Sequence, residues 1–258
     1  MLKYAANLSM LFTELPLPQR FAAAAQAGFR AVEIQFPYGH PADELAVSAS
    51  AAGVPVILIN VPAGDLMQGG AGLAGHPARV TEFAAALPQA LAYAQALGVR
   101  MVNVLPGRLA DGVTRERALV VLAANLARAA DFFRPAGIRV LCEPINDLDM
   151  PGFLLRTADE LAELLVASNC RDVGMQIDLY HMARMGQDIP ALLRRHASRI
   201  THIQFADAPG RGEPGSGDLP LAQYFNLLEE LGYAGWCAAE YRPTALTRDT
   251  LHWLDSLA

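Results

Sequence analysis

The sequence predicts a single (β/α)8 TIM barrel, and three observations carry this prediction. Short apolar runs alternate with amphipathic helical patterns along the whole chain. The runs are almost continuously apolar, as expected of parallel strands that are covered on both faces. No linker or low-complexity segment divides the 258 residues, so we expect residues 1–258 to form one domain. A doubly wound open sheet is the structural alternative.

Eight apolar runs are predicted to form the strands, and eight is the number that closes a TIM barrel. They are bounded by polar or turn-forming residues. In chain order the runs are Tyr4–Leu8, Ala31–Ile34, Val54–Ile59, Met101–Leu105, Ile138–Cys142, Val173–Ile177, Ile200–Phe205 and Trp236–Ala239.

The segments between these runs have the apolar spacing of helices that pack against a sheet. The segment Arg79–Leu97 is expected to end at Gly98, because glycine readily adopts the left-handed conformation of a helix C-cap. Pro88 lies inside it, so we expect a kink or an early break there. A second helix, Arg115–Arg134, is expected to begin after Thr114 as its N-cap.

Composition restricts the partners and the compartment. The chain is 53% hydrophobic and 18% charged with a formal net charge of -6, which argues against nucleic acid or an anionic membrane as a partner. Its three cysteines form no CxxC pair and no even set for disulfides, which favours a reducing compartment. The N-terminus has no signal-peptide pattern, and the longest uncharged run is interrupted by glycine and proline. We therefore expect a cytoplasmic, soluble protein.

Polar residues stand at or just past the end of each predicted strand. In a TIM barrel the active site lies at the carboxyl ends of the strands, so these side chains are expected to converge on one rim. They are Asn7, Glu33 or Gln35, Asn60, Asn103, Glu143, Asp178, Gln204 and Glu240.

The four strand ends of the second half suggest a specific chemistry. Three carboxylates directed at one point repel one another, so some must take up protons or hold a cation. Carboxylate and carboxamide oxygens without cysteine suit Mg²⁺ or Mn²⁺ better than Zn²⁺. Such a cation can polarise a carbonyl group while a carboxylate moves a proton between neighbouring carbons. Glu143 and Glu240 could flank a small substrate in this way.

Longer motifs surround these strand ends. They are Asn60-Val61-Pro62-Ala63-Gly64-Asp65, Glu143-Pro144-Ile145-Asn146, Asp149-Met150-Pro151-Gly152, Gln176-Ile177-Asp178-Leu179-Tyr180-His181-Met182, His202-Ile203-Gln204-Phe205-Ala206-Asp207, Pro209-Gly210-Arg211, Glu213-Pro214-Gly215, Gly232-Tyr233 and Glu240-Tyr241. With these motifs the sequence resembles the hydroxypyruvate isomerase family, a group of xylose-isomerase-like TIM barrels. The resemblance covers nearly the whole chain.

This resemblance implies an isomerase that interconverts hydroxypyruvate and tartronate semialdehyde, or a relative acting on four-carbon 2-oxo-tetronates. Glu143 and Glu240 would be the proton-transferring pair. Glu143, Asp178, Gln204 and Glu240 would hold a divalent cation, Mg²⁺ or Mn²⁺. Sugar isomerases and epimerases of this fold commonly have histidine where Gln204 stands. A carboxamide is the weaker ligand, so the cation is expected to bind loosely or to matter less than the carboxylate pair.

Further residues are predicted to contact a small hydroxy-keto acid substrate. His181 follows Asp178 in a D-x-x-H pattern that contacts substrate hydroxyls in the superfamily. Arg211 is the first choice for a partner of the substrate carboxylate, and Arg108 and Arg242 compete for that role. Asn103 and Glu213 complete the predicted substrate-binding set.

Other functions remain open at this point. A ketose 3-epimerase would use the same rim, and a non-catalytic barrel that binds small molecules is a further alternative. An endonuclease-like metal barrel is disfavoured by the negative charge and by histidine spacing unlike that of a zinc site. The motif Gly70-Ala71-Gly72-Leu73-Ala74-Gly75 lies too far past a strand, and lacks the following acid, to bind a dinucleotide. A homo-oligomer is compatible with the sequence.

Overall fold

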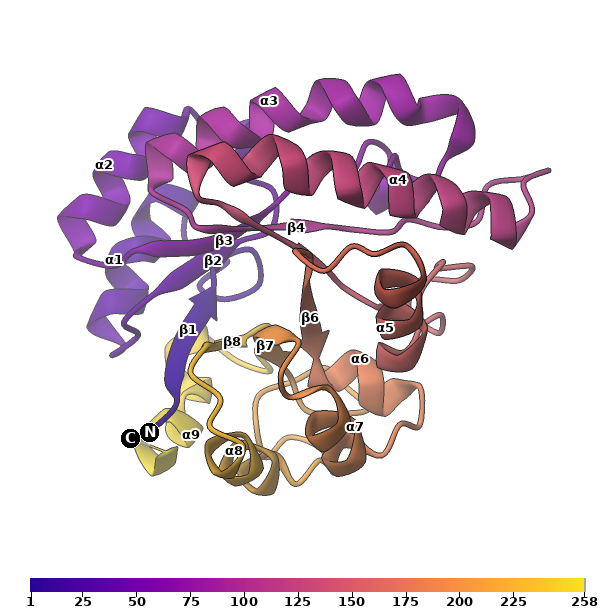
Figure 1. Cartoon of the computed structure of the whole chain (residues 1–258). Coiled ribbons are helices and arrows are strands. Elements are labelled where there is room, and N and C mark those ends of the chain that lie inside the picture. The colour runs from indigo at the N-terminus through magenta and orange to yellow at the C-terminus, as the bar shows by residue number, and fades with distance from the viewer. Residues whose placement is uncertain (258) are drawn as a thin grey trace.

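The computed structural model describes residues 1–257, so the last residue of the predicted domain lies outside the described part. Within these residues parallel strands close into the predicted barrel, in the order β1 to β8 (Figure 1). The strands are β1 Lys3–Asn7, β2 Val32–Ile34, β3 Val56–Asn60, β4 Met101–Val104, β5 Arg139–Cys142, β6 Gly174–Asp178, β7 Ile200–Phe205 and β8 Trp236–Ala239. All lie within two residues of the predicted bounds. The TIM barrel fold is confirmed.

Helices surround the barrel (Figure 1). They are α1 Leu17–Gln26, α2 Ala42–Ala52, α3 Val80–Leu97, α4 Arg115–Phe133, α5 Ala158–Ala167, α6 Leu179–Arg184, α7 Ile189–His196, α8 Leu221–Glu230 and α9 His252–Leu257. Gly98 ends α3 with φ 68°, and Thr114 caps α4 by accepting a hydrogen bond from the Arg117 amide, both as predicted. The expected early break at Pro88 is wrong, because α3 continues through it. Pro88 is exposed, so water can satisfy the carbonyl group that the ring leaves without a donor.

Closure of the barrel depends on the pairing of the first and last strands. Lys3 pairs with Trp236, and Ala6 with Ala239, so β1 runs parallel to β8. On its other side, Asn7 pairs with Glu33 of β2. Residues at the two ends of the sequence therefore lie beside each other in the barrel wall, which brings both termini to one side (Figure 1).

The interior of the barrel is apolar toward the amino ends of the strands and polar toward their carboxyl ends. At the amino ends of the strands it is filled by a small apolar cluster that includes Ala5, Leu141 and Ala238. Two residues further along their strands, Asn7 and Glu240 are buried polar side chains. The larger apolar core lies between the strands and the helices. Because the apolar layer closes the bottom of the barrel, the polar side chains can be reached only from the carboxyl end.

The surface gives no sign of a membrane-spanning segment. Within residues 1–257, none of the helices combines the length and the apolar character needed to cross a bilayer.

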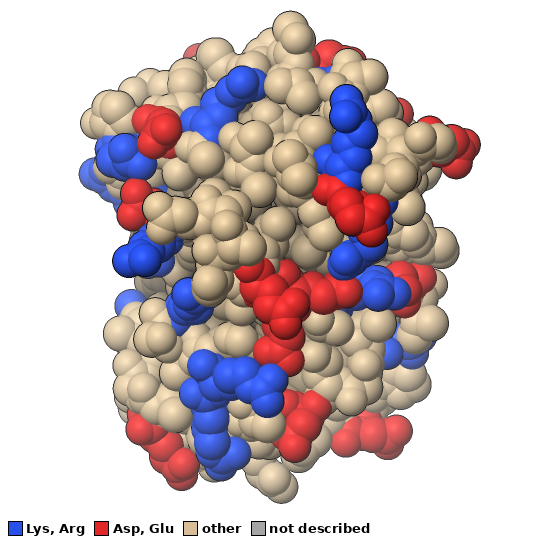
Figure 2. All heavy atoms as spheres, turned by 45° about the vertical axis from the view of Figure 1, so that its right-hand side comes forward, with Lys and Arg blue, Asp and Glu red and all other residues tan. Residues whose placement is uncertain are grey.

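On the face shown in Figure 2, acidic side chains gather near the centre, and basic side chains stand between and around them. That face therefore lacks the continuous basic surface typical of nucleic-acid binding.

Candidate active site

The polar strand ends converge as predicted, and all of them are buried except Gln35, which is partly exposed. Five of them, Gln35, Asn60, Glu143, Gln204 and Glu240, line a cavity of about 60 Å³ at the carboxyl end of the barrel. Polar side chains form one part of its wall: Gln35, Asn60, Glu143, Gln176, His181, Gln204, Arg211 and Glu240. Apolar side chains form the rest: Phe36, Met67, Leu105, Ile145 and Met150. A cavity with a polar floor and apolar sides suits a small polar ligand that must be shielded from water.

Glu143 extends from the end of β5 and is 4% exposed. One of its carboxyl oxygens, Oε2, accepts hydrogen bonds from Asn103 Nδ2 at 2.9 Å and from Gln176 Nε2 at 2.8 Å. Burial raises the pKa of Glu143 well above its ordinary value, and the nearby charges of Glu240 and Asp178 raise it further. Glu143 therefore retains a proton more readily than an ordinary carboxyl group.

Glu240 extends from the end of β8 and is the most densely bonded carboxylate of the site. Oε1 accepts from Arg211 Nη2 at 2.6 Å and from Gln35 Nε2 at 3.0 Å. Oε2 accepts from Asn7 Nδ2 at 2.8 Å and from Gln204 Nε2 at 2.5 Å. Burial raises the pKa of Glu240 to about 8, although the Arg211 charge opposes the rise. A carboxyl group with such a pKa can exchange a proton near neutral pH.

Asp178 ends β6 and begins α6. Its Oδ1 accepts from the Tyr180 amide at 2.9 Å, which caps the helix, and this fixes the carboxylate at the barrel mouth. Its Oδ2 lies 3.5 Å from Arg211 Nη2. Burial raises the pKa of Asp178 to about 6 against the opposing charge of Arg211. Asp178 is therefore mostly ionised at neutral pH.

Arg211 reaches the site from the loop after β7, and Asp207 organises that loop. The Asp207 carboxylate accepts from the Ala208, Gly215 and Leu219 amides at 2.8 to 2.9 Å. The Arg211 backbone has φ 58°, an uncommon conformation for a residue with a side chain. Its guanidinium lies 5.1 Å from the Tyr180 ring centre, within cation–π range. The side chain is thus held over the cavity with its charge directed at the carboxylates.

Arg108 and Arg242, the other two candidates for binding the substrate carboxylate, do not line the cavity. Arg108 Nη1 donates to the carbonyl oxygens of Leu66 and Gly70 at 2.8 and 3.0 Å and so fixes the loop after β3. Arg242 is exposed. Arg211 is the one of these three that lines the cavity.

His181 lies in the first turns of α6 and is 3% exposed. Its Nδ1 is 2.6 Å from Asn146 Nδ2, and its Nε2 is 3.6 Å from Asp178 Oδ2. Burial lowers the pKa of His181 well below its ordinary value, and the Arg211 charge adds to this effect. With Asn146 donating to Nδ1, the neutral ring carries its proton on Nε2, where it can donate to a ligand oxygen.

The site also contains a set of atoms that fits a divalent cation. Ligand atoms of Glu143, Asp178 and His181 all lie within 4.8 Å of one another. Two buried carboxamide oxygens, Asn103 Oδ1 and Gln176 Oε1, have no hydrogen-bond partner within the described residues. Clustered carboxylates with spare oxygen donors are the surroundings that Mg²⁺ or Mn²⁺ requires. The histidine is an addition to the predicted set, whose other members, Gln204 and Glu240, line the same cavity.

Two residues that were predicted to contact the substrate, Glu213 and Asn103, do not line the cavity. The Glu213 carboxylate accepts hydrogen bonds from the backbone amide of Thr244 at 3.1 Å and from the Thr244 hydroxyl group. Glu213 is partly exposed and is not among the residues that line the cavity. Asn103 lies behind Glu143 rather than in the cavity wall. Glu213 therefore joins two loops, and Asn103 supports a carboxylate.

A second layer of polar residues beneath the strand ends was not predicted from the sequence. Gln176 and His202 are buried inside the barrel. Each lies two residues before a predicted site residue on the same strand, Asp178 and Gln204 respectively. Because side chains alternate along a strand, the two-residue spacing was the signal that could have identified them.

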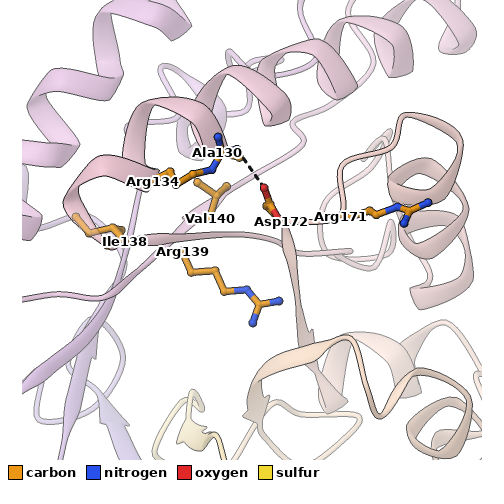
Figure 3. A pocket seen from close by; sticks show the side chains of 8 residues that line it. Ala130, Arg134, Ile138, Arg139, Val140, Arg171 and Asp172 are labelled. Atoms are coloured by element: carbon orange, nitrogen blue, oxygen red, sulfur yellow. Dashed lines mark hydrogen bonds and ion pairs between the residues drawn. The ribbon is translucent and has the colours of Figure 1, made fainter.

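A larger hollow, of about 440 Å³, lies at the amino end of β5. It is lined by the side chains of Arg134, Arg139 and Arg171 around Asp172, whose carboxylate bonds Arg134 at 3.1 Å (Figure 3). These four residues are exposed. The hollow therefore lies away from the converging carboxylates and lacks their buried acid–base groups.

Comparisons with known proteins agree with this geometry. A sequence model of the xylose isomerase-like TIM barrel family matches residues 21–257. The hydroxypyruvate isomerase of Escherichia coli is 39% identical over 255 residues, 99% of both chains. The 2-oxo-tetronate isomerase of Cupriavidus necator is 39% identical over 252 residues, 98% of this chain and 97% of the relative. A crystal structure described as AP endonuclease, family 2, from Brucella melitensis superposes with a TM-score of 0.95 at 37% identity, covering 99% of both chains.

Proposed function

Since the chain belongs to the xylose isomerase-like TIM barrel family, we propose that it isomerises a small α-hydroxy-keto acid of the hydroxypyruvate type. The observation that carries this proposal is the buried pair of carboxyl groups, Glu143 and Glu240, on strands β5 and β8 of one small cavity. Isomerase relatives of the same length and 39% identity support an enzyme with this type of reaction.

The proposed reaction moves one proton between neighbouring carbons. A base removes a proton from the hydroxymethyl carbon, and the electron pair forms the C=C bond of an enediolate. An acid then returns a proton to the adjacent carbon, while the hydroxyl proton passes from one oxygen to the other. Glu240 contacts the Arg211 charge directly, which opposes the rise of its pKa, so we assign the role of base to Glu240. Glu143 has no such contact and is assigned the role of acid.

Other side chains would bind and orient the substrate. Arg211 would pair with the substrate carboxylate; its position in the cavity wall and the match in shape between a guanidinium and a carboxylate support this role. His181, with Nε2–H directed toward Asp178, would donate to a substrate oxygen. The apolar wall, including Phe36 and Met67, would exclude water from the enediolate.

A divalent cation is part of the proposal. Glu143, Asp178, Gln204 and Glu240 would hold Mg²⁺ or Mn²⁺. When bound, the cation would polarise the substrate carbonyl and stabilise negative charge on the enediolate oxygens.

A four-carbon 2-oxo-tetronate is the second candidate substrate, because the Cupriavidus necator relative is as similar to this chain as the hydroxypyruvate isomerase. Purified protein should be incubated with hydroxypyruvate, a 2-oxo-tetronate and neutral ketoses in deuterated water, with and without EDTA. We expect product and deuterium incorporation with one of the acids and a marked loss after EDTA. Ligand binding with no deuterium incorporation from any compound would contradict the proposal and indicate a non-catalytic barrel.

The raised carboxyl pKa values predict how stability of the metal-free protein depends on pH. Glu240 has a pKa of about 8 in the folded state against an ordinary value of 4.5, so between these values the folded state binds more protons than the unfolded state. The stability contribution is therefore complete below pH 4.5 and is lost as the pH rises through 8. We expect a melting temperature roughly 5 °C higher at pH 5.5 than at pH 8.5. The fall in melting temperature between pH 5.5 and pH 8.5 should be smaller in Glu240→Gln than in the wild type. An equal fall in the two proteins would contradict this prediction.

A further inference from the structure

The orientation of the Gln204 carboxamide decides whether this side chain can serve as a ligand. A carboxamide has a donor and an acceptor end of nearly equal shape, and which end faces a given neighbour is decided by its hydrogen bonds. As a ligand for a cation, Gln204 is useful only if its oxygen is presented to the ion. A flipped amide would present N–H groups there instead.

The hydrogen bonds around Gln204 define a single orientation. Its Nε2 donates to Glu33 Oε1 at 2.6 Å and to Glu240 Oε2 at 2.5 Å. On the other side, its Oε1 accepts from Gln176 Nε2 at 2.6 Å. A flip would set the Gln204 oxygen against two carboxylate oxygens and its NH₂ group against another NH₂ group, so each of the three contacts would become repulsive.

Glu240 alone does not fix this orientation. Its two oxygens are shared among Asn7, Gln35, Gln204 and Arg211, and in the proposed reaction it also acts on the substrate. Its contact with Gln204 must therefore change during turnover. A second acceptor, outside the cavity, is needed to hold the amide while this happens.

Glu33 has the properties of that acceptor. It is 0% exposed and is not part of the cavity wall. Its Oε2 lies 2.6 Å from Nε2 of His202, which is also 0% exposed. Its Oε1 accepts from Asn7 Nδ2 at 2.8 Å as well as from Gln204. Both carboxyl oxygens of Glu33 are thus fixed by residues from two other strands, β1 and β7, and Glu33 is not among the residues that line the cavity.

From these contacts we infer that Glu33, supported by His202, is a positioning residue that holds the Gln204 carboxamide with its NH₂ group toward Glu33 and Glu240 and its oxygen toward Gln176. Its role depends on reach and on hydrogen-bond acceptance. It acts on the ligand through Gln204. The inference rests on the proposed function only in taking Gln204 as a group that contacts the cation or the substrate.

Two conservative substitutions separate reach from charge. Glu33→Gln keeps an acceptor oxygen for Asn7 and Gln204, and its NH₂ group can donate to His202 in the other ring tautomer. Glu33→Asp keeps the charge but withdraws the carboxylate by one methylene. We expect Glu33→Asp to weaken Mn²⁺ binding and kcat by about 10- to 100-fold, the usual effect of losing a group that orients a ligand. Glu33→Gln should change Mn²⁺ affinity and kcat by no more than about threefold relative to the wild type. Glu160→Asp, on α5 and outside the cavity, is the matched control.

A double-mutant cycle tests whether Glu33 acts through Gln204. In a Gln204→Met background the amide is absent, so adding Glu33→Asp should produce no further loss of Mn²⁺ affinity or of kcat. A purely structural role for Glu33 would instead give additive losses, and that result would overturn the inference. Impairment by Glu33→Gln equal to or greater than that by Glu33→Asp would also overturn it, because an acceptor oxygen at full reach would then not be sufficient.

A third measurement requires neither turnover nor metal. The side-chain NH₂ signals of Gln204 can be identified in ¹⁵N NMR spectra by their absence in Gln204→Met. We expect them to exchange slowly with solvent in the wild type and in Glu33→Gln, and to lose that protection in Glu33→Asp. Unchanged protection in Glu33→Asp would contradict the inference. If the protein isomerises none of the hydroxy-keto acids, the proposed function fails, whereas this signal still decides the role of Glu33.

Discussion

Replacing either Glu143 or Glu240 with glutamine should reduce kcat by about 10²- to 10⁴-fold, the usual contribution of a positioned proton-transfer group. Glutamine preserves the size of each side chain and removes its ability to exchange a proton. Initial rates with the preferred acid give the loss in kcat, and deuterium exchange at the substrate carbon shows which half of the reaction is blocked. Because Glu240 is assigned as base, Glu240→Gln should abolish exchange of the substrate proton. Glu143→Gln should retain part of it.

The control for these variants is Glu82→Gln, on the outer surface of α3, which should keep wild-type activity. Glu82 bonds Arg79 and lies 57% exposed, so it reports the effect of a glutamate-to-glutamine change outside the site. Circular dichroism spectra should be unchanged in all three variants. Substantial turnover in both site variants would exclude the mechanism with two carboxylates.

The strand ends could be predicted from the sequence because the barrel requires only local patterns. Each strand is short and apolar, and the residue that follows it must lie on the carboxyl rim. Glu143 and Glu240, almost a hundred residues apart, are brought into one cavity by closure of β8 onto β1. That closure is a property of the fold, so identifying eight strand–helix units was enough to predict the convergence.

The hydrogen-bonding layer below the rim was not predicted, because only one polar residue was assigned to each strand. Glu33 appeared as one of two alternatives for its strand, and His202 was not considered as a site residue. Their pairing joins β2 to β7 across the barrel interior. No sequence spacing encodes such a contact between distant strands. It depends on the stagger of the strands, which side-chain alternation alone does not provide.

The choice among the three arginines also required the structure. All of them follow strands on the correct side of the barrel, and their residue type alone gives them equal claims. Arg211 differs because Asp207 folds its loop back over the cavity and the Arg211 backbone adopts φ 58°. Loop conformations of this kind depend on hydrogen bonds between a side chain and distant backbone amides.

Arg211→Met should cause the largest change in substrate preference. Arg211 is the cation that lies against Glu240 at 2.6 Å, with its side chain 14% exposed. Truncating one partner of a buried charge pair costs about 2–5 kcal/mol, so kcat/KM for the acid substrate should fall by roughly 30-fold to several thousand-fold. Methionine keeps much of the apolar volume of the arginine side chain, so the cavity should not collapse.

The loss should depend on the charge of the substrate, which separates substrate binding from general damage to the site. A neutral ketose has no carboxylate to lose, so its kcat/KM, where measurable, should fall much less than that of hydroxypyruvate. Arg242→Met is the matched control, because Arg242 is exposed near the same loop and its substitution should leave both substrates unaffected. The removal of Arg211 should also raise the pKa of Glu240 further, so the pH at which the remaining activity appears should move upward. Equal losses for charged and neutral substrates would show that Arg211 acts on Glu240 alone, and the substrate carboxylate would then need another partner.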